Sequence, residues 1–103
     1  MHSLVERHRS AIADVCRRYG VRRLDVFGSA ARSTDFDIDS SDVDFLVEFD
    51  AAASTPSLET FFALRDALRV VLGRRIDLVT PDAMTNPYVR SDVERSREPV
   101  YAA

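Results

Sequence analysis

Three aspartates stand where they could gather around a divalent cation. Asp42 and Asp44 flank a single valine, and Asp44 leads straight into the apolar residues 45–47. Alternate residues of a β-strand face the same side, with their Cα atoms about 6.6 Å apart. Two carboxylates so placed repel each other unless a cation lies between them. Mg²⁺ takes one or two carboxylates and completes its shell with water and triphosphate oxygens, so the pair predicts a magnesium site where a strand begins.

The third aspartate, Asp77, interrupts the apolar segment 75–79. An aspartate buried in a short strand without a partner is unfavourable, so a partner is expected. If this strand lies beside that of Asp44, cross-strand neighbours are about 5 Å apart. Three carboxylates could then hold two cations roughly 3.5–4 Å apart, as two-metal phosphoryl transfer requires. The alternative is an edge-strand aspartate that faces water or pairs with Arg74 or Arg75.

A Gly-Ser pair, Gly28-Ser29, follows the strand-like segment 22–27 and precedes residues that favour a short helix over 29–32. Glycine lets a ligand approach the backbone closely, and the serine hydroxyl can donate a hydrogen bond. The start of a helix offers unpaired N–H groups and a positive dipole end, which suit a phosphate. Many simple turns also contain Gly-Ser, so the pair indicates phosphate binding only together with the aspartates.

Acidic residues are concentrated between positions 35 and 50, where seven of the 17 lie. A net charge of −3 argues against a general nucleic-acid-binding surface. The acidic segment predicts either a cation site or a solvated loop. An EF-hand calcium site is disfavoured, because its Gly and Glu positions are missing and a strand follows instead of a helix. Asp37 and Asp39 form a second Asp-x-Asp pair, but no strand follows them directly.

Length and composition indicate an ordinary globular protein. The 103 residues suit one domain, 1–103, and 46% hydrophobic with 30% charged residues is typical of a folded chain. No apolar run approaches the roughly 20 residues that a membrane-spanning helix needs. Residues 1–9 lack the apolar core of a signal peptide, so a cytoplasmic location is expected.

Lysine and cysteine usage excludes two kinds of chemistry. All 14 basic residues are arginines, so neither a lysine Schiff base nor a lysine nucleophile is available. The single cysteine, Cys16, can form neither an internal disulfide nor a zinc cluster. It lies on the apolar side of an expected helix and is predicted to be a buried structural thiol.

Hydrophobic periodicity predicts an α/β (α+β) domain with a small sheet flanked by helices. Helices are expected over 3–19, 29–32, 57–72 and 88–96, and strands over 22–27, 43–49 and 75–79. Ser, Thr and Pro before residue 57 and Gly73 after residue 72 bound the longest central helix. The dinucleotide-binding glycine fingerprint and the Gly-Lys-Ser/Thr phosphate loop are both absent.

These elements and motifs together resemble a known superfamily. The residues that carry the resemblance are Gly28-Ser29-Ala30-Ala31-Arg32, Asp42-Val43-Asp44, the segment 73–79 with Asp77, and Asn86-Pro87-Tyr88. They are similar to the motifs of the minimal nucleotidyltransferases, which belong to the polymerase-β-like nucleotidyltransferase superfamily. The likeness extends from Val5 to Tyr101. It implies a small mixed β-sheet flanked by helices, with the triphosphate bound at the Gly-Ser turn.

The resemblance also implies roles for individual residues. Asp42, Asp44 and Asp77 would be the catalytic and metal-binding residues and would hold two Mg²⁺ ions. Asp77 would also accept the proton of the attacking hydroxyl. Gly28, Ser29 and, as a further phosphate contact, Arg32 would bind the nucleoside triphosphate, with ATP as the expected substrate.

Two features depart from the family pattern. The spacer from Ala30 to Ser41 has twelve residues and is longer than is usual, and Ser33 stands where a glycine is common. We assign Asp42 and Asp44, and not the earlier Asp37 and Asp39, because a credible strand follows only the later pair. Even doubling a flexible loop costs only about 0.6 kcal/mol, so the longer spacer is compatible with the site.

The implied function is protein adenylylation. Small members of the family are typically antitoxins encoded beside an HEPN-type RNase toxin, and they silence it by adding AMP from ATP to a tyrosine. The chain has no room for a second substrate-binding domain, so a partner protein that supplies the hydroxyl makes physical sense. Neither direct nucleic-acid binding nor a membrane is expected, and assembly with the partner is open. The alternatives are a non-catalytic antitoxin that neutralises its partner by binding, and a small-molecule (antibiotic) nucleotidyltransferase.

Overall fold

The computed structural model describes residues 3–27, 42–50, 57–81 and 97–103 of the chain. Its elements follow the order α1 (Ser3–Arg7), α2 (Arg9–Arg18), β1 (Val21–Phe27), β2 (Val43–Phe49), α4 (Leu58–Leu72), β3 (Ile76–Val79) and β4 (Glu98–Ala102). The expected helices over 29–32 and 88–96 lie outside the described residues. Within the described residues, no helix is long and apolar enough to cross a membrane.

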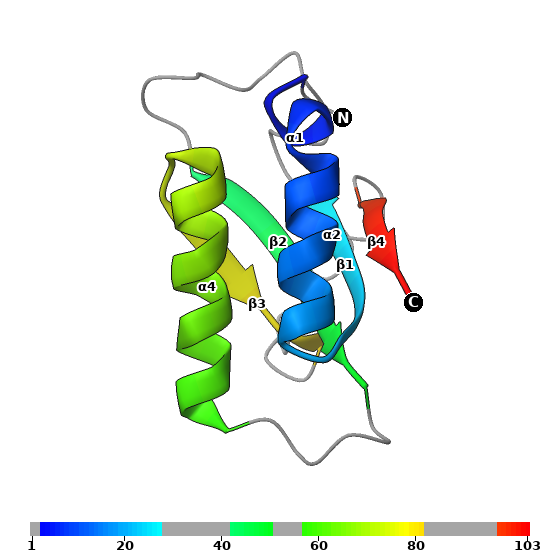
Figure 1. The fold of residues 1–103 in the computed structure, drawn as a ribbon, viewed down its shortest axis with the longest axis vertical. Coiled ribbons are helices and arrows are strands. Elements are labelled where there is room, and N and C mark those ends of the chain that lie inside the picture. Colours follow the sequence, from blue (N-terminus) through cyan, green and yellow to red (C-terminus); the bar gives the residue numbers. More distant parts are fainter. Residues whose placement is uncertain (1–2, 28–41, 51–56, 82–96) are drawn as a thin grey trace.

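The strands form one mixed sheet in the order β3-β2-β1-β4. β1 pairs antiparallel with both β2 and β4, whereas β2 and β3 run parallel. Parallel neighbours need a long crossover, and α4 lies in the chain between β2 and β3. α2 and α4 lie side by side against the same face of the sheet (Figure 1). The predicted small mixed sheet flanked by helices is therefore confirmed.

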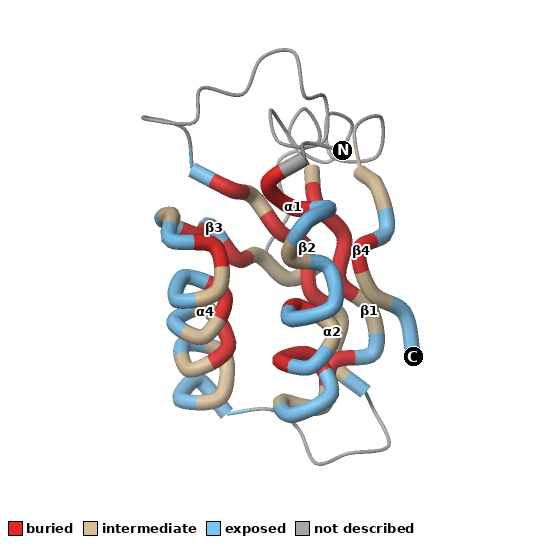
Figure 2. Tube along the Cα trace, turned by 45° about the horizontal axis from the view of Figure 1, so that its top comes forward, coloured by how far each residue is buried: buried red, intermediate tan, exposed pale blue. Residues whose placement is uncertain are grey.

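The hydrophobic core lies between this sheet face and the helices, where the buried segments of Figure 2 meet. Alternate residues of β2, namely Val43, Phe45 and Val47, are fully buried in it. Ile12 from α2 and Leu64 and Leu68 from α4 pack against them and are equally inaccessible. Because side chains alternate along a strand, the intervening residues of β2, among them Asp44, lie on the opposite face.

The helix α4 begins and ends where its local sequence directs. The Thr60 backbone N–H donates to Ser57 Oγ at 3.1 Å, which satisfies one of the unpaired donors of the first turn. Gly73 ends the helix in the left-handed conformation, with φ of 65°, and its N–H donates to Arg69 O. Both ends of the predicted helix 57–72 are confirmed to within one residue.

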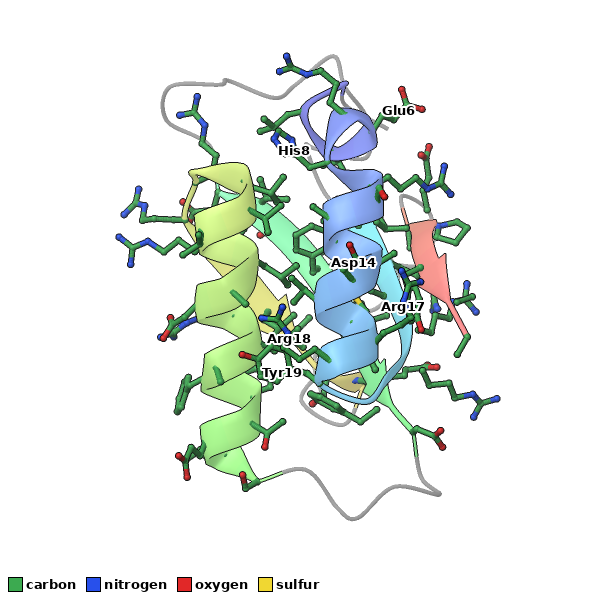
Figure 3. The ribbon with its side chains drawn as sticks, in the orientation of Figure 1. Glu6, His8, Asp14, Arg17, Arg18 and Tyr19 are labelled. Atoms are coloured by element: carbon green, nitrogen blue, oxygen red, sulfur yellow. The ribbon has the colours of Figure 1, made fainter. Side chains whose placement is uncertain are left out.

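The N-terminal helix differs from the prediction of one helix over 3–19. The chain forms α1 and α2 with a break at His8, whose φ of −103° and ψ of 10° are not helical. His8, labelled in Figure 3, is half-buried, and its Nδ1 lies 2.8 Å from Leu4 O. A packing role for His8, and not a catalytic one, agrees with this position.

The sheet also has one strand more than the three that periodicity predicts. β4 pairs with the outer side of β1 and contains Pro99, which is tolerated because β4 is an edge strand. Arg9 links α2 to this strand by donating to Val100 O at 3.4 Å and to Pro99 O at 3.3 Å. Hydrophobic periodicity does not predict this strand, because a proline and a glutamate weaken the usual strand pattern.

Candidate active site

The sheet register places two of the three predicted aspartates opposite each other. In the parallel pairing of β2 and β3, Asp44 is the direct partner of Asp77. Neighbouring strands lie about 4.8 Å apart, and paired residues face the same side of a sheet. Both carboxylates therefore stand on the face away from the helices, Asp44 half-buried and Asp77 exposed. The adjacency that the sequence argument required is present.

Asp77 is not buried, so its carboxylate does not carry the free-energy cost of an unpaired charge in the protein interior. It is exposed, and its strand β3 is the outermost of the sheet. An edge-strand aspartate that faces solvent was one of the alternatives, and in this respect it is correct. The exposure leaves the carboxylate accessible to a ligand.

Asp42 precedes β2 and lies beside the start of β3. Its Oδ1 is 3.2 Å from Arg75 Nε, and the Val43 backbone N–H donates to Arg75 O at 3.0 Å. The side chains of Arg75 and Asp42 are 76% and 47% exposed, so this ion pair is well solvated and weak. Of the two arginines proposed as alternative partners of Asp77, Arg75 pairs with Asp42 instead.

The carboxylates of Asp42, Asp44 and Asp77 are suitable ligands for a hard cation, although the three side chains do not converge on one point. Carboxylate oxygens are the ligands that Mg²⁺ prefers, and Asp44 and Asp77 present theirs from adjacent strands. In the parts of the chain that the structure describes, no three His, Cys, Asp or Glu side chains are close enough together to bind a metal. The assignment of Asp42 as a third ligand therefore remains a prediction.

β1 leads the chain toward the same two carboxylates. Its last residue, Phe27, is the antiparallel partner of Asp44, so β2 carries β1 on one side of Asp44 and β3 on the other. Gly28, the first residue of the predicted phosphate-binding turn, is bonded to Phe27. Gly28, Ser29 and Arg32 themselves lie outside the described residues, as do Asp37 and Asp39, and their roles remain predictions.

A cleft of about 510 Å³ opens on the β3 side of these aspartates. The described residues of its lining are mostly charged: Arg65 and Arg69 from α4, Arg75 and Ile76 from the start of β3, and the predicted site residues Asp42 and Asp77. Sequence reasoning did not find Arg65 and Arg69. The one available signal was their i, i+4 spacing, which places both on one side of a helix.

Asp25 is another charged residue that sequence reasoning missed. It is fully buried, and it accepts hydrogen bonds from Arg97 Nε at 2.7 Å and from Arg23 Nε at 3.0 Å. Arg97 Nη2 lies 2.6 Å from the same oxygen, Oδ2. Because Arg97 directly precedes β4, this ion pair joins β4 to β1 two residues before Phe27. Its role is to hold the sheet beside the site.

Cys16 takes no part in this chemistry. It is fully buried in the core, and burial raises the pKa of its thiol from 9.0 to about 12. A thiol with such a pKa is neutral and a poor nucleophile at physiological pH. The predicted buried structural thiol is confirmed.

Comparison with known proteins agrees with this arrangement. A family model described as a nucleotidyltransferase domain matches residues 8–100. The protein adenylyltransferase MntA of Thermococcus cleftensis is 34% identical to this chain over 101 residues, which are 98% of this chain and 91% of the relative.

Solved structures share the fold over nearly the whole chain. A candidate minimal nucleotidyltransferase superposes with a TM-score of 0.75 at 33% identity, and 96% of each chain is covered. A chain from the complex of the tri-AMPylated HEPN toxin of Shewanella oneidensis with its MNT antitoxin superposes with a TM-score of 0.66. It is 17% identical, with 96% of this chain and 73% of that chain covered, so this second likeness concerns the fold alone.

Proposed function

This chain belongs to the nucleotidyltransferase domain family, and from that membership we propose that it transfers AMP from ATP to a hydroxyl of a partner protein. The observation that carries the proposal is the register of the sheet, which pairs Asp44 with Asp77 and brings the residue before Gly28 to the same place. The partner proposed is an HEPN-type toxin, and the acceptor group is a tyrosine hydroxyl.

The partner class rests on relatives and not on contacts in this structure. MntA of Thermococcus cleftensis is named a protein adenylyltransferase, and the Shewanella complex joins an MNT antitoxin to an AMPylated HEPN toxin. The present chain would then act as an antitoxin.

The reaction balances as a single displacement at phosphorus. The acceptor oxygen forms a bond to the α-phosphorus of ATP, the bond from that phosphorus to the oxygen bridging to the β-phosphate breaks, and pyrophosphate leaves. The acceptor proton passes to the carboxylate of Asp77. The part of this chain is to position donor and acceptor on either side of Asp44, and positioning of this kind removes several kcal/mol from a barrier.

Asp44 and Asp77, joined by Asp42, would hold Mg²⁺. When bound, the metal neutralises the negative charge of the phosphate oxygens. For Asp42 to join the ligand set it must leave Arg75, and the weakness of their solvated ion pair makes that exchange inexpensive. Gly28, Ser29 and Arg32 would bind the triphosphate from the β1 side.

The test is transfer from ATP labelled in its α-phosphate to a lysate of the source cell, followed by gel separation of the proteins. The wild type is compared with Asp44→Asn and with Asp14→Asn, a control on α2 whose side chain is 66% exposed (Figure 3). One labelled band with the wild type and the control, and none with Asp44→Asn, supports a protein nucleotidyltransferase.

Two other results would each decide against the proposal. If no band forms although the chain still captures a partner, the function is a non-catalytic neutralisation by binding. If label appears in a small molecule and in no protein, the chain is a small-molecule nucleotidyltransferase.

A further inference from the structure

One side of α4 carries a stripe of side chains that the proposed reaction does not use. The members of this α4 stripe are Leu58, Phe62, Arg65 and Arg69, which follow one another at four, three and four residues. At about 100° per residue, the four side chains lie within roughly 60° of one another around the helix axis. Leu58 is 70% exposed and Phe62 is 41% exposed. Exposed apolar side chains that continue into charged ones on one face are typical of an interaction surface.

Each end of the α4 stripe opens into a hollow of the surface. Because α4 connects the end of β2 to the start of β3, it runs back along the sheet (Figure 1). At its start, Leu58 and Phe61 belong to the described lining of a hollow of about 320 Å³. At its end, Arg65 and Arg69 line the charged cleft that includes Asp77. Eleven residues separate Leu58 from Arg69, so at about 1.5 Å each the ends of the stripe are roughly 16 Å apart.

Direct side-chain contacts join the two hollows. The rings of Phe61 and Phe62 meet edge to face, with their centres 5.6 Å apart. Arg65 Cζ in turn lies 4.8 Å from the centre of the Phe62 ring. Such a cation–π contact holds the guanidinium over the ring and leaves its edge accessible to an anion. The α4 stripe is therefore one continuous surface, apolar near the start of α4 and cationic near its end.

The cationic end can exchange its present partners for a carboxylate of another protein. Among the described lining residues of the charged cleft, three guanidinium groups stand against two carboxylates, whereas the whole chain has a net charge of −3. Arg69 has no acidic partner among the described residues. Arg65 lies 3.5 Å from Asp66 Oδ1, in a pair whose side chains are 42% and 64% exposed. A long, solvated ion pair of this kind is weak, so replacing it requires little free energy.

The spacing of the α4 stripe indicates the kind of partner that fits it. Side chains at such intervals of three and four residues form the ridge by which one helix packs against another. A partner helix with apolar residues at one end and acidic residues about two turns further on matches the stripe in polarity and in length. A polynucleotide matches it less well, because Glu59 and Asp66 lie about a quarter turn away on α4 and repel phosphates.

We propose that the α4 stripe is the docking surface for an amphipathic helix of the acceptor protein. The apolar residues of that helix cover Leu58 and Phe62, and its carboxylates pair with Arg65 and Arg69. A helix bound in this way ends beside the cleft that includes Asp77, and so directs the acceptor toward the proposed proton acceptor. This inference rests on the proposed function, since it names how the protein acceptor is held at the same site.

The binding test uses two designed Ala-rich peptides of about 18 residues, long enough to form isolated helices. Both carry a pair of leucines one turn apart, and two turns further on one peptide carries a pair of glutamates and the other a pair of lysines. Binding to the wild type is followed by amide NMR at low and high salt. The glutamate peptide should bind at least roughly tenfold more tightly, shift the amides of residues 58–69, and lose this advantage at high salt. Equal affinities, or shifts confined to other elements, overturn the inference.

Charge reversal supplies a variant whose result cannot be explained by misfolding. Arg65→Glu/Arg69→Glu should prefer the lysine peptide, and an unaltered preference for the glutamate peptide overturns the inference. Leu58→Ser/Phe62→Ser should bind both peptides roughly tenfold more weakly, because the apolar contact is lost. Val70→Ser is the matched control and should bind as the wild type does. Val70 is 84% exposed on the same helix but lies roughly 100° around the axis from the middle of the stripe.

The transfer test measures KM and kcat for the acceptor protein that the labelled ATP identifies. Leu58→Ser/Phe62→Ser should raise KM at least roughly tenfold with a smaller effect on kcat, and Val70→Ser should change neither. An unchanged KM in the first variant overturns the inference. A single-stranded RNA oligonucleotide that binds the stripe more tightly than the glutamate peptide overturns it too. If the wild type labels no protein, the proposed function fails, and the peptide titrations still decide whether the α4 stripe binds an acidic amphipathic helix.

Discussion

Replacing Arg97 by alanine should destabilise the protein far more than any other single loss of an arginine in the described ion pairs. Arg97 places two nitrogens on Oδ2 of Asp25, at 2.7 and 2.6 Å. Asp25 is fully buried, so the variant leaves a carboxylate in the interior whose remaining partner among the described residues is Arg23 Nε, 3.0 Å from the other oxygen. Removal of one partner from a buried ion pair costs about 3–5 kcal/mol.

The retained contact with Arg23 places the expected loss near the lower end, at about 3 kcal/mol. Arg23→Ala should cost less, about 1 kcal/mol, because its side chain is 42% exposed and the closer Arg97 remains. For a domain of this size, each kcal/mol lowers Tm by about 4–8 °C. Arg97→Ala should therefore lower Tm by roughly 12–24 °C.

The assay is urea and thermal unfolding followed by circular dichroism, with tyrosine fluorescence as a second probe because the chain has no Trp. Arg17→Ala is the matched control, since its pair with Asp14 is on the surface and should contribute less than about 0.5 kcal/mol. Adding Asp25→Asn to Arg97→Ala should recover part of the stability, because the buried charge is then removed. If Arg97→Ala costs no more than Arg23→Ala, or if Asp25→Asn brings no recovery, the buried ion pair does not hold β4 to β1 as argued.

Three further predictions concern pH, metal and helix ends. The folded pKa of Cys16, about 12, exceeds its ordinary 9.0, so the thiol ionises first in the unfolded chain. The thiol should leave the free energy of unfolding unchanged below pH 9 and lower it by about 1.4 kcal/mol per pH unit above pH 9. Urea titrations of Cys16→Ala should lack this slope, and an identical slope in the variant would contradict the prediction. Labelling of the partner should vanish in EDTA and return with Mg²⁺, whereas labelling that resists EDTA would argue against a carboxylate-bound metal. Ser57→Ala should lower the free energy of unfolding by about 1 kcal/mol, because the Thr60 N–H loses its acceptor. Gly73→Ala should cost about as much, because alanine disfavours the φ of 65°, although the space around the added Cβ is open. Both costs are measured from urea midpoints, and values near zero would mean that α4 ends elsewhere in solution.

How much the sequence predicts depends on how local the signal is. The helix α4 follows from Ser57, Gly73 and the apolar period between them, all of which act within a few residues. Strand β2 was predicted with its observed bounds, because the β-branched and aromatic run 43–49 has no competing reading. The break at His8 was not predictable in this way, since the same apolar spacing continues through it.

In the candidate site, too, the local features can be predicted from the sequence and the long-range contacts cannot. Residue types and chain spacing single out Asp42, Asp44 and Asp77 as chemically unusual, because a carboxylate in or next to an apolar strand segment is unfavourable unless it has a partner. Which of them are neighbours is decided by the parallel register of β2 and β3, which pairs Asp44 with Asp77 across residues far apart in the chain. Register is set by the fit of whole strand faces against the core, and a shift of one residue would turn every side chain to the other face.

The class of chemistry, the family resemblance and the elements whose ends are set by local hydrogen bonds and backbone preference can all be inferred from the amino-acid sequence. Three features become visible only in the folded chain: the fourth strand, the burial of Asp25 beside Arg97, and the position of Arg65, Arg69 and Asp77 around one cleft. Each of these features is a contact between segments that are distant in the chain. Their free energy comes from burial and charge pairing after folding, and no local pattern of residue types carries that information.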